Sequence, residues 1–178
     1  RFRLCAEARL APAAGLGEPV DPAALRERCP RLVTGEVHYR DLAGRGAAFG
    51  AAFRGVRQIW AGEEEALGEI EALRPTLAGN RPHPVVLDAC LQVAAAAFAA
   101  STATFLPVSL DRFVCRDTEW PARALGHAIA RNADPGRPAF DFTVIDPNGA
   151  PLAQIQNLAF RKTSTANAGD DPQRWLYE

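Results

Sequence analysis

The sequence predicts an α+β domain in which one long apolar helix packs against a single antiparallel sheet of about five to seven strands. Residues 85–100 contain no helix-breaking residue, are rich in alanine and are apolar nearly all round, as expected of a helix enclosed by other structure. The segments around it alternate apolar and polar side chains between turn signals, which is typical of antiparallel strands. At 178 residues the chain is long enough to bury the core of one domain.

The N-terminal part predicts a strand, a linker and a short helix. Residues 2–10 alternate apolar and polar side chains and predict a strand. Residues 11–22 are rich in proline and glycine and predict a linker. A short helix over residues 23–28 is expected next, because Asp21 is suited to its N-cap and Pro22 to its first position.

The next segment predicts a helix, a glycine-rich loop and a hairpin. Residues 35–43 are expected to form a short helix that carries His38 and Tyr39. In residues 46–55, two phenylalanines and three glycines predict a loop that allows close approach of a ligand or another chain segment. Two alternating runs follow and predict a hairpin; they are residues 56–60 and 65–73, joined at Ala61 and Gly62.

After the long helix the pattern predicts four strands in a meander. These are residues 104–115, 122–131, 139–145 and 150–161. Pro107 lies near the start of the first strand, where a missing backbone donor is tolerated. Residues 146–149, Asp-Pro-Asn-Gly, are a strong turn signal between two of the strands.

Two polar residues interrupt the long helix and require an explanation. Asp88 and Gln92 are four residues apart, so they lie on one face within hydrogen-bonding reach of each other. They either meet polar partners across a packed interface or face a pocket. Pro84 precedes them at a position suited to the first helical turn.

The composition argues against several classes of function. A net charge of −1 gives no electrostatic case for nucleic acid or an anionic membrane, and no apolar run has the length of a membrane-spanning helix. The four cysteines are too scattered for metal-ligand pairs, and we expect free thiols in a reducing cytoplasm rather than disulfides. The chain contains no methionine, so we expect a piece of a longer polypeptide.

The order of three motifs resembles the C-terminal half of a polyketide synthase dehydratase domain, which is a double hot dog. The motifs are Gly46-x-x-Phe49-Gly50-x-x-Phe53, then His83-Pro84-x-x-Leu87-Asp88-x-x-x-Gln92, then Leu106-Pro107. The resemblance implies a hot-dog fold, in which the long helix is wrapped by the sheet. It also implies three parts. Residues 1–32 are the end of the preceding half and the linker between the two halves, residues 33–163 form the C-terminal hot-dog domain, and residues 164–178 are an exit linker to the next domain.

The resemblance also implies a reaction, namely loss of water from a β-hydroxyacyl chain carried on the phosphopantetheine of an acyl carrier protein, with no cofactor bound directly. Asp88 is then the acid for the leaving hydroxyl and Gln92 orients it, whereas the base is a histidine of the upstream half. Burial at an apolar helix surface should raise the pKa of Asp88 and favour its protonated form. The residues expected to bind the acyl chain are Phe49, Gly50, Phe53, Leu87, Leu91 and Pro107.

The same resemblance leaves other functions and partners open. Phe49 and Ala51 replace the tyrosine and proline that are usual in the family's loop, so a related isomerase, cyclase or product-shaping domain, or an inactive scaffold that holds an acyl chain, are alternatives. The expected partners are the upstream half, the acyl carrier protein and neighbouring synthase domains, with a homodimer of this chain as an alternative pairing.

The histidines and Cys90 have simpler interpretations than catalysis. His83 is expected to be a structural residue before Pro84, and His38 and His127 to lie at the surface or at a sheet edge. Cys90 shares the helix of Asp88, but a thiol in apolar surroundings is expected to be inert.

Overall fold

The computed structural model describes residues 6–11, 15–72, 82–97, 104–131, 134 and 136–162. In order along these residues, the helices and strands are α1 (Pro22–Arg28), β1 (Arg31–Thr34), α2 (Gly35–Gly44), the 3₁₀ helix η1 (Ala51–Phe53), β2 (Val56–Ala61), β3 (Glu65–Glu71), α3 (Pro84–Gln92), α4 (Ala94–Ala97), β4 (Phe105–Ser109), β5 (Arg112–Cys115), β6 (Arg123–Ala130), β7 (Ala139–Ile145) and β8 (Pro151–Lys162).

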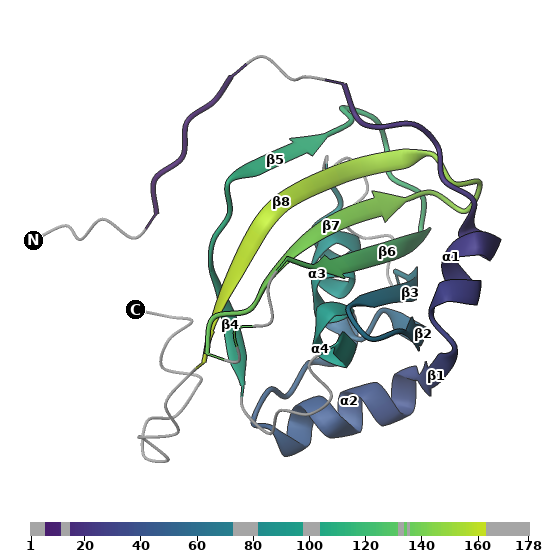
Figure 1. The fold of residues 1–178 in the computed structure, drawn as a ribbon, viewed down its shortest axis with the longest axis vertical. Coiled ribbons are helices and arrows are strands. Elements are labelled where there is room, and N and C mark those ends of the chain that lie inside the picture. The colour runs from purple at the N-terminus through teal and green to yellow at the C-terminus, as the bar shows by residue number, and fades with distance from the viewer. Residues whose placement is uncertain are drawn as a thin grey trace, which may run out of the picture.

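All eight strands of the described chain belong to one antiparallel sheet that curves around α3 (Figure 1). The strand order is β1-β2-β3-β6-β7-β8-β4, and β5 pairs with β8 as well. The long strand β8 therefore holds β7 along one side and β4 and β5 in succession along the other. The predicted α+β architecture, one apolar helix wrapped by an antiparallel sheet, is confirmed, but the described residues form eight strands rather than the predicted five to seven.

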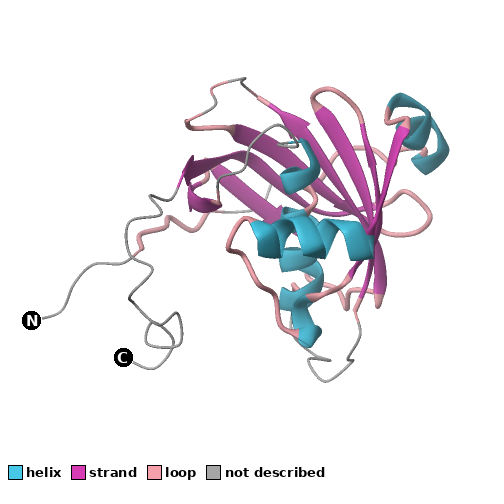
Figure 2. Ribbon diagram, turned by 90° about the horizontal axis from the view of Figure 1, so that it is seen from below, coloured by secondary structure: helices cyan, strands magenta, loops and turns pink. Residues whose placement is uncertain are grey.

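The two faces of the sheet are covered differently. Helices α2, α3 and α4 lie on the same side of the sheet (Figure 2), and the main apolar cluster joins α3 to alternate residues of β3 and β6. On the opposite face, Leu25 of α1 packs with Leu67, Leu125 and Ile145 in a smaller cluster. The period of two along each strand puts these residues on the face away from α3.

A pair of glycines lets α3 and the turn that follows it lie close to the sheet. Gly68 of β3 and Gly126 of β6 are direct partners in the strand register. A Cβ atom at Gly126 would lie 2.9 Å from the Cα of Cys90, and one at Gly68 would lie 2.2 Å from a methyl carbon of Val93. Any larger residue would therefore push the helix outward, so this pair sets the position of the helix that carries Asp88.

The central helix is shorter than the sequence predicts. His83 caps α3, where its ring nitrogen Nδ1 accepts from the N–H of Val86 at 3.4 Å, and Pro84 follows in the first turn. Val93, which packs against Gly68, interrupts the predicted continuous helix, and its N–H bonds to the carbonyl of Cys90, three residues back. The chain continues as α4, and residues 98–100 lie outside the described residues.

Three further predictions of elements differ from the structure. The described part of the predicted first strand, residues 6–10, is exposed and irregular, and residues 2–5 lie outside the described residues. The single strand predicted over residues 104–115 is two strands, β4 and β5, because the chain bends between them while both pair with β8. Strand β1 was not predicted, since four residues are too few to show a period.

The predicted turn over residues 146–149 is present. The N–H of Gly149 donates to the carbonyl of Asp146 at 3.0 Å, and Gly149 has a φ of +93°, which a glycine adopts without strain. The predicted exit linker, residues 164–178, lies outside the described residues. In the described part of the chain, no helix has the length and apolar character needed to cross a membrane.

Candidate functional site

A cavity of about 260 Å³ lies beside α3 and is walled mainly by apolar side chains. Its lining comes from α2, the loop after α2, α3, α4, β4 and β8. The lining residues are Leu42, Arg45, Ala47, Phe49, Asp88, Leu91, Gln92, Ala95, Thr104, Phe105, Leu106, Pro107 and Phe160. An apolar pocket with a few convergent polar groups is the usual form of a small-molecule site.

Asp88 and Gln92 meet as their spacing predicts. The Gln92 amide nitrogen Nε2 donates to Oδ2 of Asp88 at 2.7 Å and to the backbone carbonyl of Phe53 at 3.1 Å. Both partners are acceptors, so the orientation of the amide is fixed with its nitrogen toward them. Gln92 is buried, and its own oxygen Oε1 has no hydrogen-bond partner among the described residues.

The half-buried carboxyl group of Asp88 holds a proton more readily than an ordinary aspartate. Burial raises its pKa, while the hydrogen bond from Gln92 opposes part of that rise. Because Oδ2 accepts from Gln92, the proton of the neutral form resides on Oδ1, the other oxygen. The arrangement can therefore supply a proton from one defined oxygen at the wall of the cavity.

The predicted acyl-binding residues divide into two groups. Phe49, Leu91 and Pro107 line the cavity, whereas Gly50, Phe53 and Leu87 are not part of the lining formed by the described residues. The side chain of Phe53 is 44% exposed, and this residue contributes its carbonyl oxygen instead, through its bond to Gln92.

Leu87 and Gly50 have roles in packing and backbone geometry. Leu87 lies on α3 and packs against the two apolar clusters on the concave side of the sheet. Gly50 precedes η1, and its carbonyl accepts from the N–H of Phe53 at 2.9 Å.

Several lining residues were not predicted because they come from distant parts of the sequence. Leu42 belongs to the end of α2 and Arg45 directly follows that helix, while Phe105 belongs to β4 and Phe160 to β8. Strand pairing brings Phe105 opposite Lys162 and so places β4 beside the end of β8. No local motif in the sequence indicates that pairing.

The three histidines lie elsewhere. His83 caps α3, which confirms its predicted structural role. The prediction that His38 and His127 lie at the surface or a sheet edge is wrong, because both are buried. His127 is on β6, inside the sheet, and its Nε2 lies 2.6 Å from Oε1 of Glu65 on β3.

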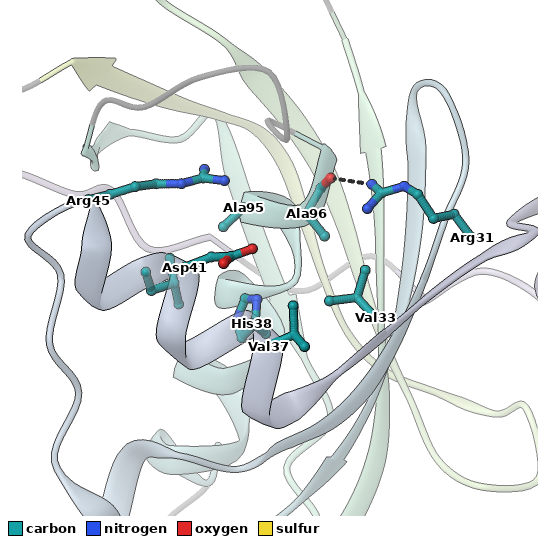
Figure 3. Close-up of a pocket in the computed structure, with 9 residues that line it drawn as sticks. Arg31, Val33, Val37, His38, Asp41, Arg45, Ala95 and Ala96 are labelled. Atoms are coloured by element: carbon teal, nitrogen blue, oxygen red, sulfur yellow. Dashed lines mark hydrogen bonds between the residues drawn. The ribbon is translucent and has the colours of Figure 1, made fainter.

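His38 lines a second, smaller cavity between α2, β1 and α4 (Figure 3). Burial, with Arg45 nearby, lowers the pKa of His38 to about 4, and its Nε2 has no partner among the described residues. Arg31 crosses the same region and donates to the carbonyl of Ala96 at 3.0 Å, as Figure 3 shows. His38 is therefore a neutral, buried imidazole outside the Asp88 cavity.

The described residues contain no cluster of three or more acidic, histidine or cysteine side chains able to hold a metal ion. Cys90 is fully buried on α3, and burial raises the pKa of its thiol well above the ordinary range. The thiol therefore stays protonated beside Asp88, in agreement with its predicted inertness.

Residues 17–170 match the family model described as the polyketide synthase dehydratase N-terminal domain. The chain belongs to the polyketide synthase dehydratase family. The description names the N-terminal domain, whereas the Asp88 motif resembles the second half of such a domain. The match therefore establishes the family.

Two curated relatives of the chain are polyketide synthases. The chain is 36% identical over 131 residues to the putative inactive phenolphthiocerol synthesis polyketide synthase type I Pks1 of Mycobacterium tuberculosis, covering 69% of this chain and 8% of that protein. It is 32% identical over 168 residues to the spectinabilin polyketide synthase system protein NorA of Streptomyces orinoci, covering 88% of this chain and 8% of that protein. The dehydratase chain thus spans less than a tenth of the length of these relatives.

Solved dehydratase structures confirm the predicted hot-dog fold. The dehydratase domain from the CurK module of curacin polyketide synthase superposes with a TM-score of 0.74 at 23% identity, over 83% of this chain and 54% of that one. The dehydratase domain from the CurH module gives a TM-score of 0.73 at 25% identity, over 86% of this chain and 56% of that one. This chain therefore covers little more than half of each solved dehydratase domain.

Proposed function

We propose that this chain is the second hot-dog half of a polyketide synthase dehydratase domain and supplies the acid for elimination of water. One observation carries the proposal. Asp88 stands at the wall of an apolar cavity, with its pKa raised by burial and its carboxyl group held by Gln92, while none of the three histidines is in the described lining of that cavity. Within the described lining, the site has an acid and no histidine that could act as the base.

The lack of a histidine in the described lining of the Asp88 cavity also supports assigning this chain to the second half of the dehydratase rather than the first. A first half would have to present the histidine that removes the α-proton. In this chain, however, His38 lines a separate cavity, His83 caps α3 and His127 contacts Glu65 within the sheet. The Asp88-x-x-x-Gln92 motif and the loop that contains Phe49 match the second half instead. We keep residues 33–163 as the proposed limits of this half, although β1 begins slightly earlier, at Arg31.

The proposed reaction uses both halves of the double hot dog. The histidine of the upstream half removes the proton at the α-carbon, and that electron pair forms the α,β double bond as the β-carbon–oxygen bond breaks. Oδ1 of Asp88 gives its proton to the departing hydroxyl group, which leaves as water. Because Gln92 engages Oδ2, the proton is directed from one oxygen only.

The lining suggests an acyl substrate held by apolar contacts. Phe49, Leu91 and Pro107 form part of a wall that is suited to a β-hydroxyacyl chain, which the phosphopantetheine arm of an acyl carrier protein would deliver. Acid–base elimination of this kind requires no further cofactor. The neighbouring synthase domains would supply the substrate and take up the product.

The edge of the sheet beside the cavity offers a place for the upstream half. Leu106, Val108, Leu110 and Phe113 on and between β4 and β5 are 38–54% exposed. Exposed apolar side chains on an edge strand favour pairing with another chain segment. We propose that the upstream half covers this edge, and that a second copy of the chain can take its place when the upstream half is absent.

The test joins this chain to the upstream segment of its parent polypeptide and supplies a β-hydroxyacyl acyl carrier protein. We expect an enoyl product, seen by mass spectrometry as the loss of one water, which Asp88→Asn abolishes. The matched control is Glu27→Gln, which makes the same carboxylate-to-amide change at an exposed residue of α1, on the face of the sheet opposite the cavity. Turnover that survives Asp88→Asn would refute the role of Asp88.

Phe49 favours a second candidate, an acyl-chain-binding domain without turnover. In the resembling family this position is usually tyrosine, and Phe49 brings no hydroxyl donor to the cavity wall. If so, the joined halves bind the acyl carrier protein substrate without releasing water, and Phe49→Tyr restores turnover. A shifted double bond without water loss would instead indicate the related isomerase.

A further inference from the structure

We propose that Tyr39 is a positioning residue for Asp88 and acts through the backbone carbonyl of Phe53 and the amide of Gln92. The proposal rests on the proposed function only for its catalytic consequence, because the orientation of Asp88 matters to turnover only if Asp88 is the acid. The chain of hydrogen bonds itself is a property of the fold.

Four hydrogen bonds in series connect the start of β2 to the carboxyl group. The hydroxyl of Tyr39, on α2, accepts from the N–H of Val56 at 2.9 Å and lies 3.3 Å from the carbonyl oxygen of Phe53, to which it donates. The same carbonyl accepts from Nε2 of Gln92 at 3.1 Å. Gln92 in turn donates to Asp88 at 2.7 Å.

Only a group that both donates and accepts can occupy the position of the hydroxyl. The N–H of Val56 needs an acceptor and the carbonyl of Phe53 is itself an acceptor, so a hydroxyl satisfies both. Burial raises the pKa of Tyr39 to about 12, so the group keeps its proton throughout the neutral range. A phenylalanine at this position would leave the buried N–H of Val56 without its partner.

The ring of Tyr39 also contacts residues on both sides of η1. It packs edge-on against Phe49, a wall of the Asp88 cavity, with ring centroids 6.2 Å apart. The guanidinium of Arg54 lies 4.9 Å from the centre of its ring. The 3₁₀ helix η1 buries none of its residues and has no side-chain cap, so the position of its Phe53 carbonyl depends on contacts such as these.

The first experiment measures the pKa of Asp88 in the 178-residue chain by ¹³C carboxyl NMR, with Asp88→Asn to assign the resonance. Since donation from Gln92 lowers the pKa of Asp88, we expect Tyr39→Phe to raise it and Gln92→Leu to raise it at least as far. Tyr39→Phe added to Gln92→Leu should cause no further shift, because both act on one path.

A matched control separates positioning from general destabilisation. Ile145→Val trims a buried residue on the opposite face of the sheet and should leave the pKa of Asp88 at the wild-type value. An unchanged pKa in Tyr39→Phe would overturn the proposal, as would an equal shift in Ile145→Val.

A fluorine label tests the same path without removing the hydroxyl. The chain has two tyrosines, so in a Tyr177→Phe background 3-fluorotyrosine labels position 39 alone. We expect its ¹⁹F resonance to move as Asp88 titrates, and the movement to collapse in Gln92→Leu. A ¹⁹F response that persists in full in Gln92→Leu would show direct charge coupling through space and would overturn the relay.

Turnover by the chain joined to its upstream half distinguishes this proposal from the proposed function. We expect Tyr39→Phe to lower kcat about tenfold with little change in KM, as loss of orientation in the transition state does. If Asp88→Asn abolishes water loss while Tyr39→Phe changes neither kcat nor the pKa of Asp88, the relay is refuted and the function stands. If Tyr39→Phe moves the pKa but Asp88→Asn leaves turnover intact, the relay stands and the function is refuted.

Discussion

Replacing Gly126 with alanine should displace the helix that carries Asp88. The added Cβ would lie 2.9 Å from Cα, 3.0 Å from Cβ and 3.1 Å from Sγ of Cys90, all well inside van der Waals contact. Carbon atoms in contact are about 3.5–4.0 Å apart, so α3 or β6 has to move by roughly 0.6–1 Å. The nearest atom belongs to the backbone of α3, so a change of side-chain rotamer cannot relieve the contact.

The expected magnitude follows from the cost of overpacking a core. Gly126→Ala should lower the free energy of unfolding by about 1–3 kcal/mol. For a chain of this size each kcal/mol lowers Tm by about 2–4 °C. Asp88, the proposed acid, lies two residues before Cys90 on the same helix, and a displacement of about 1 Å at a reacting group can lower kcat about 100-fold.

Urea unfolding and turnover by the joined halves, measured on the same variant, form the assay. Gly44→Ala is the control, because a Cβ at Gly44, in the last turn of α2, would have no neighbour within 4 Å. That variant should be neutral or stabilise the fold by up to about 1 kcal/mol. If Gly126→Ala unfolds and turns over like the wild type, the glycine pair does not set the position of α3.

Three further outcomes follow from the structure. Burial lowers the pKa of His38 to about 4, so the stability that its neutral form gives the fold is present above the ordinary pKa of about 6.5 and is lost as pH falls toward 4. In urea unfolding, the free energy of unfolding should therefore fall by about 2 kcal/mol between pH 7 and pH 4.5 through this residue, and His38→Phe should lack that decrease. Burial raises the pKa of Asp88, so its ionisation above that pKa makes the folded state less stable. Asp88→Asn should therefore have a higher Tm than the wild type at pH 7. Calorimetry should show this difference in Tm shrinking as pH falls through the pKa of Asp88. Thr34 caps α2 by accepting from the N–H of Val37 at 3.4 Å, so Thr34→Ala should cost about 0.5–1 kcal/mol in urea unfolding while Thr34→Ser stays near wild type.

The sequence was sufficient where the signal is local. The four-residue spacing of Asp88 and Gln92 predicts their hydrogen bond, because residues i and i+4 lie on the same side of a helix whatever surrounds it. The turn at residues 146–149 and the cap of α1 by Asp21 follow in the same way from residues close in sequence. The buried character of α3 was evident from its composition.

The rest depended on which strands pair and which faces meet. The division of residues 104–115 into β4 and β5 reflects their separate pairing with β8, and the burial of His127 reflects the central place of β6 in the sheet. Phe53 was expected to offer its ring, but the fold uses its carbonyl, since η1 turns that oxygen toward Gln92.

The sequence by itself determined the helix that carries Asp88 and Gln92, the hydrogen bond between them and the resemblance to one family. Only the tertiary structure decided what the pair faces: a cavity whose other walls come from α2, β4 and β8. It also decided that Tyr39, 49 positions before Asp88, shares a hydrogen-bond path with it. The reason is physical: helical spacing is set by the covalent chain, whereas packing between elements depends on all of their surfaces together.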